Sequence, residues 1–365
     1  MKIAFITSFF PPDRVAGAEL GTHFMAKYMA EKGHEVHVLI TRPKVEKYRE
    51  ELRDGYIIHW LGAKRLKGFR FFSEVADSIK CLKTIKPDIV HGNCLLPGGY
   101  VAAQYGKKYG AKSVLLCYGY DVCDMSKLQA YWGRKALRGV DLALAATEYC
   151  SGVMKNWAPD INPQIYYAGC DIEAFPLLAE HRDSKVIKLL FIGRMIPVKG
   201  FELLLNLMAK LPENYQLDVL GQGELLQDYK QKSLSLGLEG RIHFHGLVPN
   251  KDIQHYFSKA HCLVLPSRRE PFGVVAIEAI CSGVPVVGAH VMGLPEAVAS
   301  ERNGFVVKNR EVADWEKAIR LVCENSQLRS QLYQNAKEDR GKWAWSAQLR
   351  VLENMYQKLI SKIGR

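Results

Sequence analysis

Two carboxylates eight residues apart are the strongest candidates for chemistry in this chain. Glu270 and Glu278 flank the tripeptide Pro-Phe-Gly within the segment 265–279. On a continuous helix rising roughly 1.5 Å per residue, they would lie about 9 to 12 Å apart. That spacing suits a sugar joined through a diphosphate to a ribose, with one carboxylate on the sugar hydroxyls and the other on the ribose diol. The alternative is that both glutamates only cap and solvate a helix, although an unpaired carboxylate on an apolar Val, Ile and Ala face is costly.

The residues between the two glutamates form a candidate anion site. Pro271 suits the first position of a helix, which would leave free N–H groups at the positive helix end on Phe272, Gly273 and Val274. We therefore expect phosphate oxygens to bind there.

A second candidate site combines two cations with glycines. The segment 192–200, IGRMIPVKG, places Arg194 and Lys199 between an apolar run and a helix-like run. This pattern predicts a clamp for a diphosphate, and the alternative is a solvated turn between a strand and a helix. Because the segment is neither a Walker loop nor Gly-x-Gly-x-x-Gly, nucleotide hydrolases and dehydrogenases are disfavoured.

These segments require a scaffold of parallel strands. Short apolar runs alternate with helix-length segments over residues 1–170, and the rhythm restarts after a charge-mixed linker at 171–185. This pattern predicts an α/β protein with two Rossmann-like domains, at 1–170 and 171–345, facing a deep cleft. The expected strands are 2–7, 35–40, 56–60, 88–91, 113–117, 142–145, 164–167, 186–192, 217–220, 241–244, 262–265 and 284–288.

Composition and cysteine usage fit a folded protein in the reducing environment of the cytoplasm. The 365 residues are 48% hydrophobic and 24% charged, and neither a membrane-spanning run nor a secretory signal is evident. The nine cysteines include no Cys-x-x-Cys pair, so we expect buried thiols rather than disulfides or a zinc site. His243 and His245 alternate along one expected strand, which favours packing over metal binding. We therefore expect no metal and no cofactor.

The net charge of +12 raises the question of anionic partners. Residues 1–170 carry most of the surplus, but no recognition motif gathers it, so nucleic acid is not an expected partner. The stretch Lys64–Phe72 does place four cations among three phenylalanines. It predicts reversible docking to an anionic membrane at the inner face, whereas the alternative is that the phenylalanines begin the packed face of the next helix.

Together these motifs resemble the retaining glycosyltransferases of family 4, which have the GT-B fold. The resemblance spans nearly the whole chain, and jointly its motifs are specific. They include the following segments: Pro11-Pro12, Gly17-Ala18-Glu19, Gly33-His34-Glu35-Val36, Tyr118-Gly119-Tyr120-Asp121, Gly169-Cys170-Asp171 with Phe175, Gly193-Arg194, Lys199-Gly200, Glu270 to Glu278, Gly283 to Val287, and Gly304.

The resemblance implies transfer of a sugar from a nucleotide diphosphate sugar, with UDP expected as the nucleotide, to a hydroxyl of a glycan, a lipid-linked or a small-molecule acceptor. Arg194 and Lys199 would hold the diphosphate in place of a metal, Glu278 the ribose and Glu270 the sugar, while Gly17 would let a loop of the first domain approach the phosphates. It also implies that the final helix, 346–365, crosses back to the first domain. A GT-B nucleotide-sugar epimerase or phosphorylase is the alternative enzyme class, which the Glu270 to Glu278 motif disfavours.

Three positions depart from the family pattern. Tyr118 stands where many relatives have histidine near the sugar, Ala16 where a second glycine is common, and Ala168 where asparagine usually occurs. Asp121 is retained and is a candidate for the sugar site.

Overall fold

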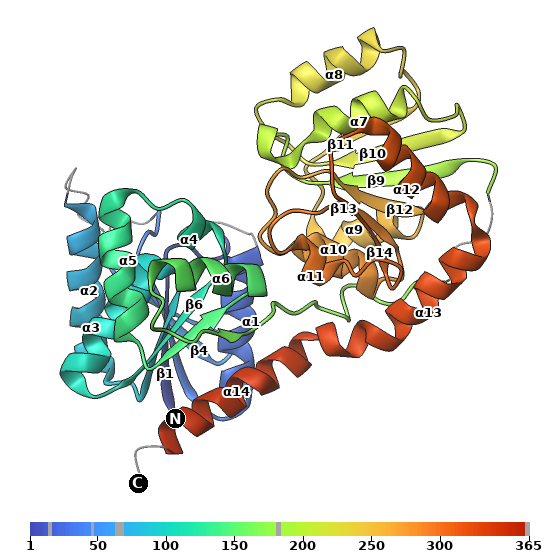
Figure 1. Cartoon of the computed structure of the whole chain (residues 1–365). Coiled ribbons are helices and arrows are strands. Elements are labelled where there is room, and N and C mark those ends of the chain that lie inside the picture. The colour runs from blue at the N-terminus through green and yellow to red at the C-terminus, as the bar shows by residue number, and fades with distance from the viewer. Residues whose placement is uncertain (14–16, 45–46, 63–68, 180–183, 362–365) are drawn as a thin grey trace. The chain divides into compact units, whose positions relative to one another are not determined.

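The computed structural model describes residues 1–13, 17–44, 47–62, 69–179 and 184–361. The chain divides into unit 1, Met1–Ala168 with Ser346–Arg365, and unit 2, Gly169–Trp345. Each unit is an α/β layer structure in which helices pack on a mainly parallel sheet (Figure 1).

The sheet of unit 1 has eight strands in the order β3-β4-β2-β1-β5-β6-β7-β8. β3 runs antiparallel to β4, and the other neighbouring pairs are parallel. The chain order reverses between β1 and β5, and open sheets of this kind bind ligands at the carboxyl ends of the strands there. The strands are β1 (Lys2–Thr7), β2 (Glu35–Ile40), β3 (Arg49–Arg53), β4 (Tyr56–Trp60), β5 (Ile89–Asn93), β6 (Lys112–Cys117), β7 (Leu142–Ala145) and β8 (Gln164–Ile165).

Helices bury the apolar faces of this sheet. On one side α2, α3 and α5 lie next to one another (Figure 1), and the apolar faces of α2 and α3 pack against β1 and β5. The last helix also belongs to unit 1, where the Tyr28 hydroxyl donates to Glu353 at 3.0 Å and the buried Tyr356 shares a hydrogen bond with His91. The helices are α1 (Gly17–Glu31), α2 (Arg70–Ile85), a π-turn (Leu95–Gly99), α3 (Tyr100–Tyr109), α4 (Tyr120–Cys123), α5 (Lys127–Gly139), α6 (Glu148–Trp157) and α14 (Trp345–Ser361).

Unit 2 is built around six parallel strands in the order β11-β10-β9-β12-β13-β14. Its chain order reverses between β9 and β12, so the loops that follow these two strands are where a ligand is expected. The strands are β9 (Ile187–Ile192), β10 (Tyr215–Leu220), β11 (Ile242–Gly246), β12 (Cys262–Leu265), β13 (Val286–Ala289) and β14 (Gly304–Val307).

The core of unit 2 centres on α7, whose sequence FELLLNLM is almost wholly apolar and buried. Such a helix, apolar on most sides, is stable only inside a protein. The other helices surround the sheet and complete the unit. The helices are a 3-10 turn (Pro197–Lys199), α7 (Phe201–Met208), α8 (Leu226–Ser235), α9 (Asn250–Phe257), α10 (Val274–Cys281), α11 (Leu294–Ala297), α12 (Val312–Glu324) and α13 (Ser326–Trp343).

The two α/β units with parallel sheets confirm the predicted fold class. Two strands were not predicted: β3, because REELR is charged throughout, and β14, because Gly304–Val307 is short. None of the nine cysteines forms a disulfide, although three of them, Cys81, Cys94 and Cys123, are only half-buried. No helix within the described ranges is long and apolar enough to cross a membrane.

Candidate functional site

The loops that follow β9 and β12 are held together at the carboxyl edge of unit 2. The Arg268 N–H donates to the Val198 carbonyl at 2.8 Å. Gly200 has φ +66°, and a Cβ at this position would lie 2.1 Å from the Pro266 carbonyl oxygen. Because only glycine avoids both the strained φ and this clash, Gly200 brings the two loops into direct contact.

This contact joins two residues that the sequence assigned to different parts of a donor. Lys199 Nζ lies 2.6 Å from Glu270 Oε2, and their side chains are only 19% and 11% exposed. The Ser267 hydroxyl donates to the same oxygen at 3.2 Å. Lys199 and Ser267 both bind Oε2, so Glu270 is held in one orientation while Oε1 can accept from a ligand hydroxyl.

Arg194 is the other predicted cation of this edge, and its side chain is exposed. Its loop is fixed by the neighbouring Met195, whose N–H donates to the Gln222 carbonyl at 2.9 Å in the loop after β10. Within the described ranges the Arg194 guanidinium makes no hydrogen bond or ion pair. Arg194 is therefore a cation on a fixed backbone that is free to bind an anion.

The helix of the Pro-Phe-Gly motif begins later than the sequence predicted. α10 begins at Val274, and Gly273 precedes it as the N-cap with φ +88°. The prediction that Pro271 occupies the first helical position is therefore wrong, because left-handed backbone at Gly273 interrupts the helix between the two. Phe272 lies in the turn before the helix and is buried against Trp343, with ring centroids 6.0 Å apart. The first N–H groups of α10, beginning with Val274, still form a positive helix end.

Glu278 lies in the second turn of α10 and is half-buried. Loss of hydration raises the pKa of its carboxyl from 4.5 to about 8. Of the eight intervals from Glu270 to Glu278, only the last four, from Val274 to Glu278, are helical. The distance between the two carboxylates that was expected from a continuous helix therefore does not apply. No cation in the described part of the chain lowers this pKa, and carboxyls with strongly raised pKa values cluster at functional sites.

Three residues of this edge were missed from the sequence. Ser267 holds Glu270, and Arg310 Nη1 donates to the Pro266 carbonyl at 2.8 Å. Met292, between β13 and α11, has φ +47°, a conformation that favours glycine. Ser267 lies inside the motif and could have been noticed, whereas Arg310 follows a strand that was not predicted.

The predicted residues of unit 1 lie on two loops. Gly17 is the first residue of α1. The Asp121 carboxylate accepts from the N–H groups of Leu95, Tyr118 and Gly119 at 2.9 to 3.0 Å. Burial raises the pKa of Asp121, and these N–H groups oppose the rise. Asp121 thus joins the loops that follow β5 and β6, and its proposed contact with a sugar stays a prediction.

Tyr118, which replaces the family's histidine, directs its hydroxyl into the protein. That hydroxyl is buried without a hydrogen-bond partner in the described part of the chain, and burial raises its pKa well above the usual range. Tyr118 is therefore unsuited to proton transfer. Ala16 lies outside the described residues.

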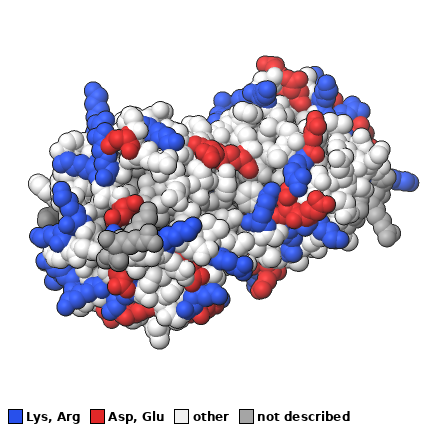
Figure 2. Space-filling model, turned by 60° about the horizontal axis from the view of Figure 1, so that its bottom comes forward, with Lys and Arg blue, Asp and Glu red and all other residues white. Residues whose placement is uncertain are grey.

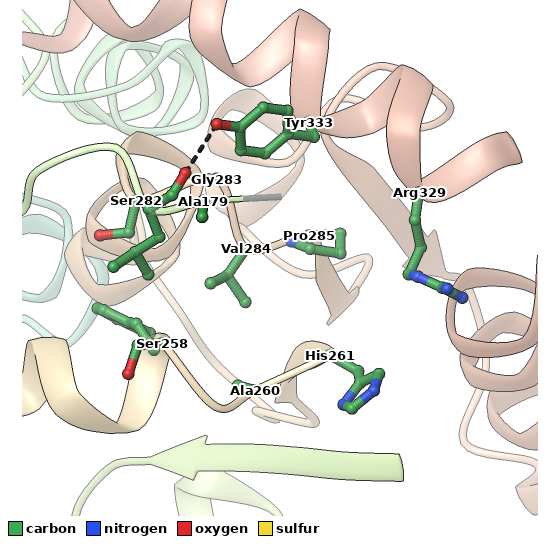
Figure 3. Close-up of a pocket in the computed structure, with 12 residues that line it drawn as sticks. Ala179, Ser258, Ala260, His261, Ser282, Gly283, Val284, Pro285, Arg329 and Tyr333 are labelled. Atoms are coloured by element: carbon green, nitrogen blue, oxygen red, sulfur yellow. Dashed lines mark hydrogen bonds between the residues drawn. The ribbon is translucent and has the colours of Figure 1, made fainter. Parts of the chain in front are cut away.

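An enclosed cavity in unit 2 is distinct from these residues. Ser258, His261, Ser282 and Tyr333 are among its lining residues, and the Tyr333 hydroxyl donates to the Leu178 carbonyl at 2.7 Å (Figure 3). The cavity measures about 20 Å³, which is room for one water molecule. His261 precedes β12, so the cavity lies near the amino ends of the strands and contains none of the predicted site residues.

The stretch predicted to dock on membranes is described only in part. Lys64–Gly68 lies outside the described residues. Phe69 and Phe72 are 66% and 52% exposed. Phe71 packs against Tyr100 and Trp132, with ring centroids 5.5 and 5.9 Å apart, as the alternative interpretation expected. On the face drawn in Figure 2, basic and acidic side chains are interspersed.

Two Rossmann-like units, one with cations and a carboxylate at its carboxyl edge, are the arrangement expected of a GT-B glycosyltransferase. Residues 173–339 match the model described as glycosyl transferases group 1, and residues 15–173 match the model of glycosyltransferase family 4. The chain belongs to this family.

Relatives and solved structures agree with this assignment. An uncharacterized glycosyltransferase of Methanocaldococcus jannaschii is 25% identical, with 100% of both chains covered. The D-inositol 3-phosphate glycosyltransferase of Corynebacterium kroppenstedtii is 31% identical over 47% of this chain and 40% of its own. Sucrose-phosphate synthase from Thermosynechococcus elongatus has a TM-score of 0.84 at 20% identity, covering 99% of both chains. Anabaena HepE in complex with UDP-glucose has a TM-score of 0.79 at 19% identity, covering 98% of this chain and 100% of its own.

Proposed function

We propose that this glycosyltransferase moves a hexose from a UDP-sugar to a hydroxyl group, with retention of configuration and without a metal ion. The observation that carries the proposal is the Lys199–Glu270 pair beside the exposed Arg194 at the carboxyl edge of unit 2. It combines cations for a diphosphate with a fixed carboxylate for sugar hydroxyls.

The two cations would act on the leaving group. As the bond from the sugar to UDP breaks, negative charge grows on the diphosphate, and preorganised cations stabilise that charge. Arg194 binds two oxygens through its planar guanidinium, and Lys199 adds a second charge. The N-terminus of α10 supplies N–H donors, so the residues present can take the place of a metal.

The carboxylates would position the donor rather than attack it. Glu270 is paired with Lys199, which suits it to accept sugar hydroxyls and not to form a covalent intermediate. Retention then follows if the acceptor hydroxyl attacks the face that UDP leaves, and the departing phosphate oxygen takes its proton. Glu278 would accept from the ribose diol.

The choice of UDP is supported by the Anabaena neighbour, which was solved with UDP-glucose. For the acceptor, the relative named as acting on D-inositol 3-phosphate supports a hydroxyl-bearing molecule. A glycan, a lipid-linked glycan and a small molecule all remain within the proposal.

We also propose that the protein is cytoplasmic and docks on anionic membranes through Lys64–Phe72. Phe69 and Phe72 expose aromatic surface beside Arg70, and such groups enter lipid interfaces while cations attract anionic headgroups. Co-sedimentation with vesicles of anionic and of neutral lipid tests this proposal. A Phe69→Ser/Phe72→Ser variant should lose binding to anionic vesicles, whereas Leu247→Ser, which changes an exposed apolar residue of unit 2, should not. Equal binding by both variants, or no binding by the wild type, removes docking from the proposal.

A thermal-shift panel of UDP-, GDP- and ADP-sugars in EDTA tests the donor proposal. A bound ligand raises Tm by mass action, so UDP-sugars should stabilise the chain. Arg194→Ala should reduce that stabilisation, and Arg138→Ala, which removes an exposed arginine of unit 1 paired with Asp160, should preserve it. Stabilisation by no nucleotide sugar, or only with added magnesium, contradicts the proposal.

A further inference from the structure

The carboxyl edge of the unit 1 sheet holds two arginines around one buried glutamate. Glu74, in the second turn of α2, has a fully buried side chain. Arg42, two residues beyond β2, donates from Nε to Oε1 at 2.8 Å and from Nη2 to Oε2 at 3.2 Å. Arg70, the first residue of α2, donates from Nε to Oε1 at 2.8 Å.

This cluster carries more positive charge than its glutamate requires. A buried carboxylate needs one well-placed cation, and here a second guanidinium leaves one charge in excess. The side chains of Arg42 and Arg70 remain 32% and 44% exposed. Nη1 of Arg42 and both Nη atoms of Arg70 have no acceptor in the described part of the chain. The glutamate therefore fixes two guanidinium groups whose remaining donors are available to a ligand.

The cluster lies where the strand order reverses. The Arg42 N–H donates to the Ser8 carbonyl at 3.0 Å, which ties it to the end of β1. Cys94, directly after β5, has a thiol pKa raised to about 12 by burial, and the charge of Arg42 opposes that rise. Arg42 thus lies near the ends of β1, β2 and β5, the place where open sheets bind ligands. Cys94 also has φ +83°, and such strained backbone clusters at functional sites.

We propose that Arg42 and Arg70 bind a phosphate monoester carried by the acceptor substrate. Guanidinium groups match phosphate oxygens in pairs, and two of them on one fixed carboxylate form a preorganised anion site. The inference rests on the proposed transfer reaction, since it names the class of its acceptor.

Binding of inorganic phosphate to the full chain tests the site without turnover. The chain is first saturated with UDP so that the donor site is filled, and phosphate is then titrated by calorimetry. We expect the wild type to bind phosphate and Arg70→Gln to bind it about 10- to 100-fold more weakly, as for loss of one charged hydrogen-bond partner. Arg70→Gln leaves the Arg42–Glu74 pair in place, so its fold should persist. Arg42→Lys keeps the charge but not the paired geometry and should also bind more weakly.

Arg138→Gln is the matched control, since it removes an exposed arginine of the same unit and should not change phosphate affinity. Unchanged affinity in Arg70→Gln and Arg42→Lys overturns the proposal, as does a wild type that binds no phosphate. Failure of the donor proposal gives a different result: UDP does not bind, and phosphate affinity then depends on Arg42 and Arg70 but not on Arg194.

Competition separates the two sources of such a phosphate. Glycerol 3-phosphate and its lipid counterpart, lysophosphatidic acid in neutral detergent, are compared as competitors of inorganic phosphate, with glycerol as the uncharged control. Competition by both phosphates supports the site on any acceptor, and competition by the lipid alone assigns it to a lipid-linked one. Equal competition by glycerol overturns the assignment to phosphate.

Discussion

Replacing Glu278 by glutamine should stabilise the chain and weaken its donor binding at the same time. In the folded chain the carboxyl pKa is about 8 instead of 4.5, because burial disfavours the charged form. Below pH 4.5 the carboxyl is neutral in both the folded and the unfolded chain and costs nothing. As the pH rises from 4.5 to 8, the unfolded chain ionises first, so stability falls.

The size of this effect follows from the two pKa values. A carboxyl held at about 8 costs the folded chain at most about 3 kcal/mol at pH 7 and about 5 kcal/mol above pH 8. In urea unfolding at pH 5, 7 and 8.5, the free energy of unfolding of Glu278→Gln should therefore increase relative to that of the wild type as the pH rises. Glu224→Gln, at an exposed acid of the same unit, should show no such trend. A constant difference between Glu278→Gln and wild type at all three pH values refutes the reasoning.

Donor binding should change in the opposite direction. If the ribose hydroxyls donate to the ionised Glu278, UDP-glucose binding must release a proton, and affinity should rise about tenfold per pH unit below pH 8. Glu278→Gln should bind weakly and without this pH dependence. Calorimetry of UDP-glucose between pH 6 and 8.5 measures both quantities, and equal affinities for the two proteins remove Glu278 from the ribose site.

Three further changes test the site and its scaffold. Gly200→Ala should cost roughly 3 kcal/mol in urea unfolding, because its Cβ would meet a carbonyl at 2.1 Å, whereas Gly237→Ala, at a similar φ in open space, should cost about 1 to 2 kcal/mol. Asp121→Asn should lower the free energy of unfolding by about 1 to 3 kcal/mol, because it weakens the hydrogen bonds from the loop N–H groups to this side chain. Unchanged hydrogen exchange in those loops contradicts this role. Arg194→Ala and Lys199→Ala should each lower kcat about 10²- to 10³-fold in EDTA, and wild-type turnover in either variant removes the clamp.

The strands were predictable because buried parallel strands consist of apolar runs with turns between them. Ile187–Ile192 lies within the predicted range 186–192, and Val286–Ala289 overlaps the predicted range 284–288. Arg49–Arg53 was not predictable, since an edge strand of charged residues has no apolar alternation. The start of α10 was misplaced because proline suits a first turn, whereas the left-handed backbone at Gly273, which ends the preceding turn, is one of several conformations open to glycine.

The site itself was predictable as a set of residues but not as a geometry. Glu270 and Lys199 were both chosen, yet their ion pair depends on the approach of two loops after non-consecutive strands. Spacing along the chain gives no information about such an approach. The pairing of Arg42 with Glu74 could not be predicted either, because the two residues are 32 positions apart and belong to different elements.

Arg194 and Lys199 are proposed to hold a nucleotide diphosphate sugar without a metal. The most direct test is calorimetric titration of the wild type, Arg194→Ala and Lys199→Ala with UDP-glucose in EDTA. We expect binding by the wild type and a loss of affinity of at least about tenfold in each variant, on the scale of a charge-assisted hydrogen bond. Equal affinity in all three proteins, or wild-type binding only after magnesium or manganese is added, would contradict it.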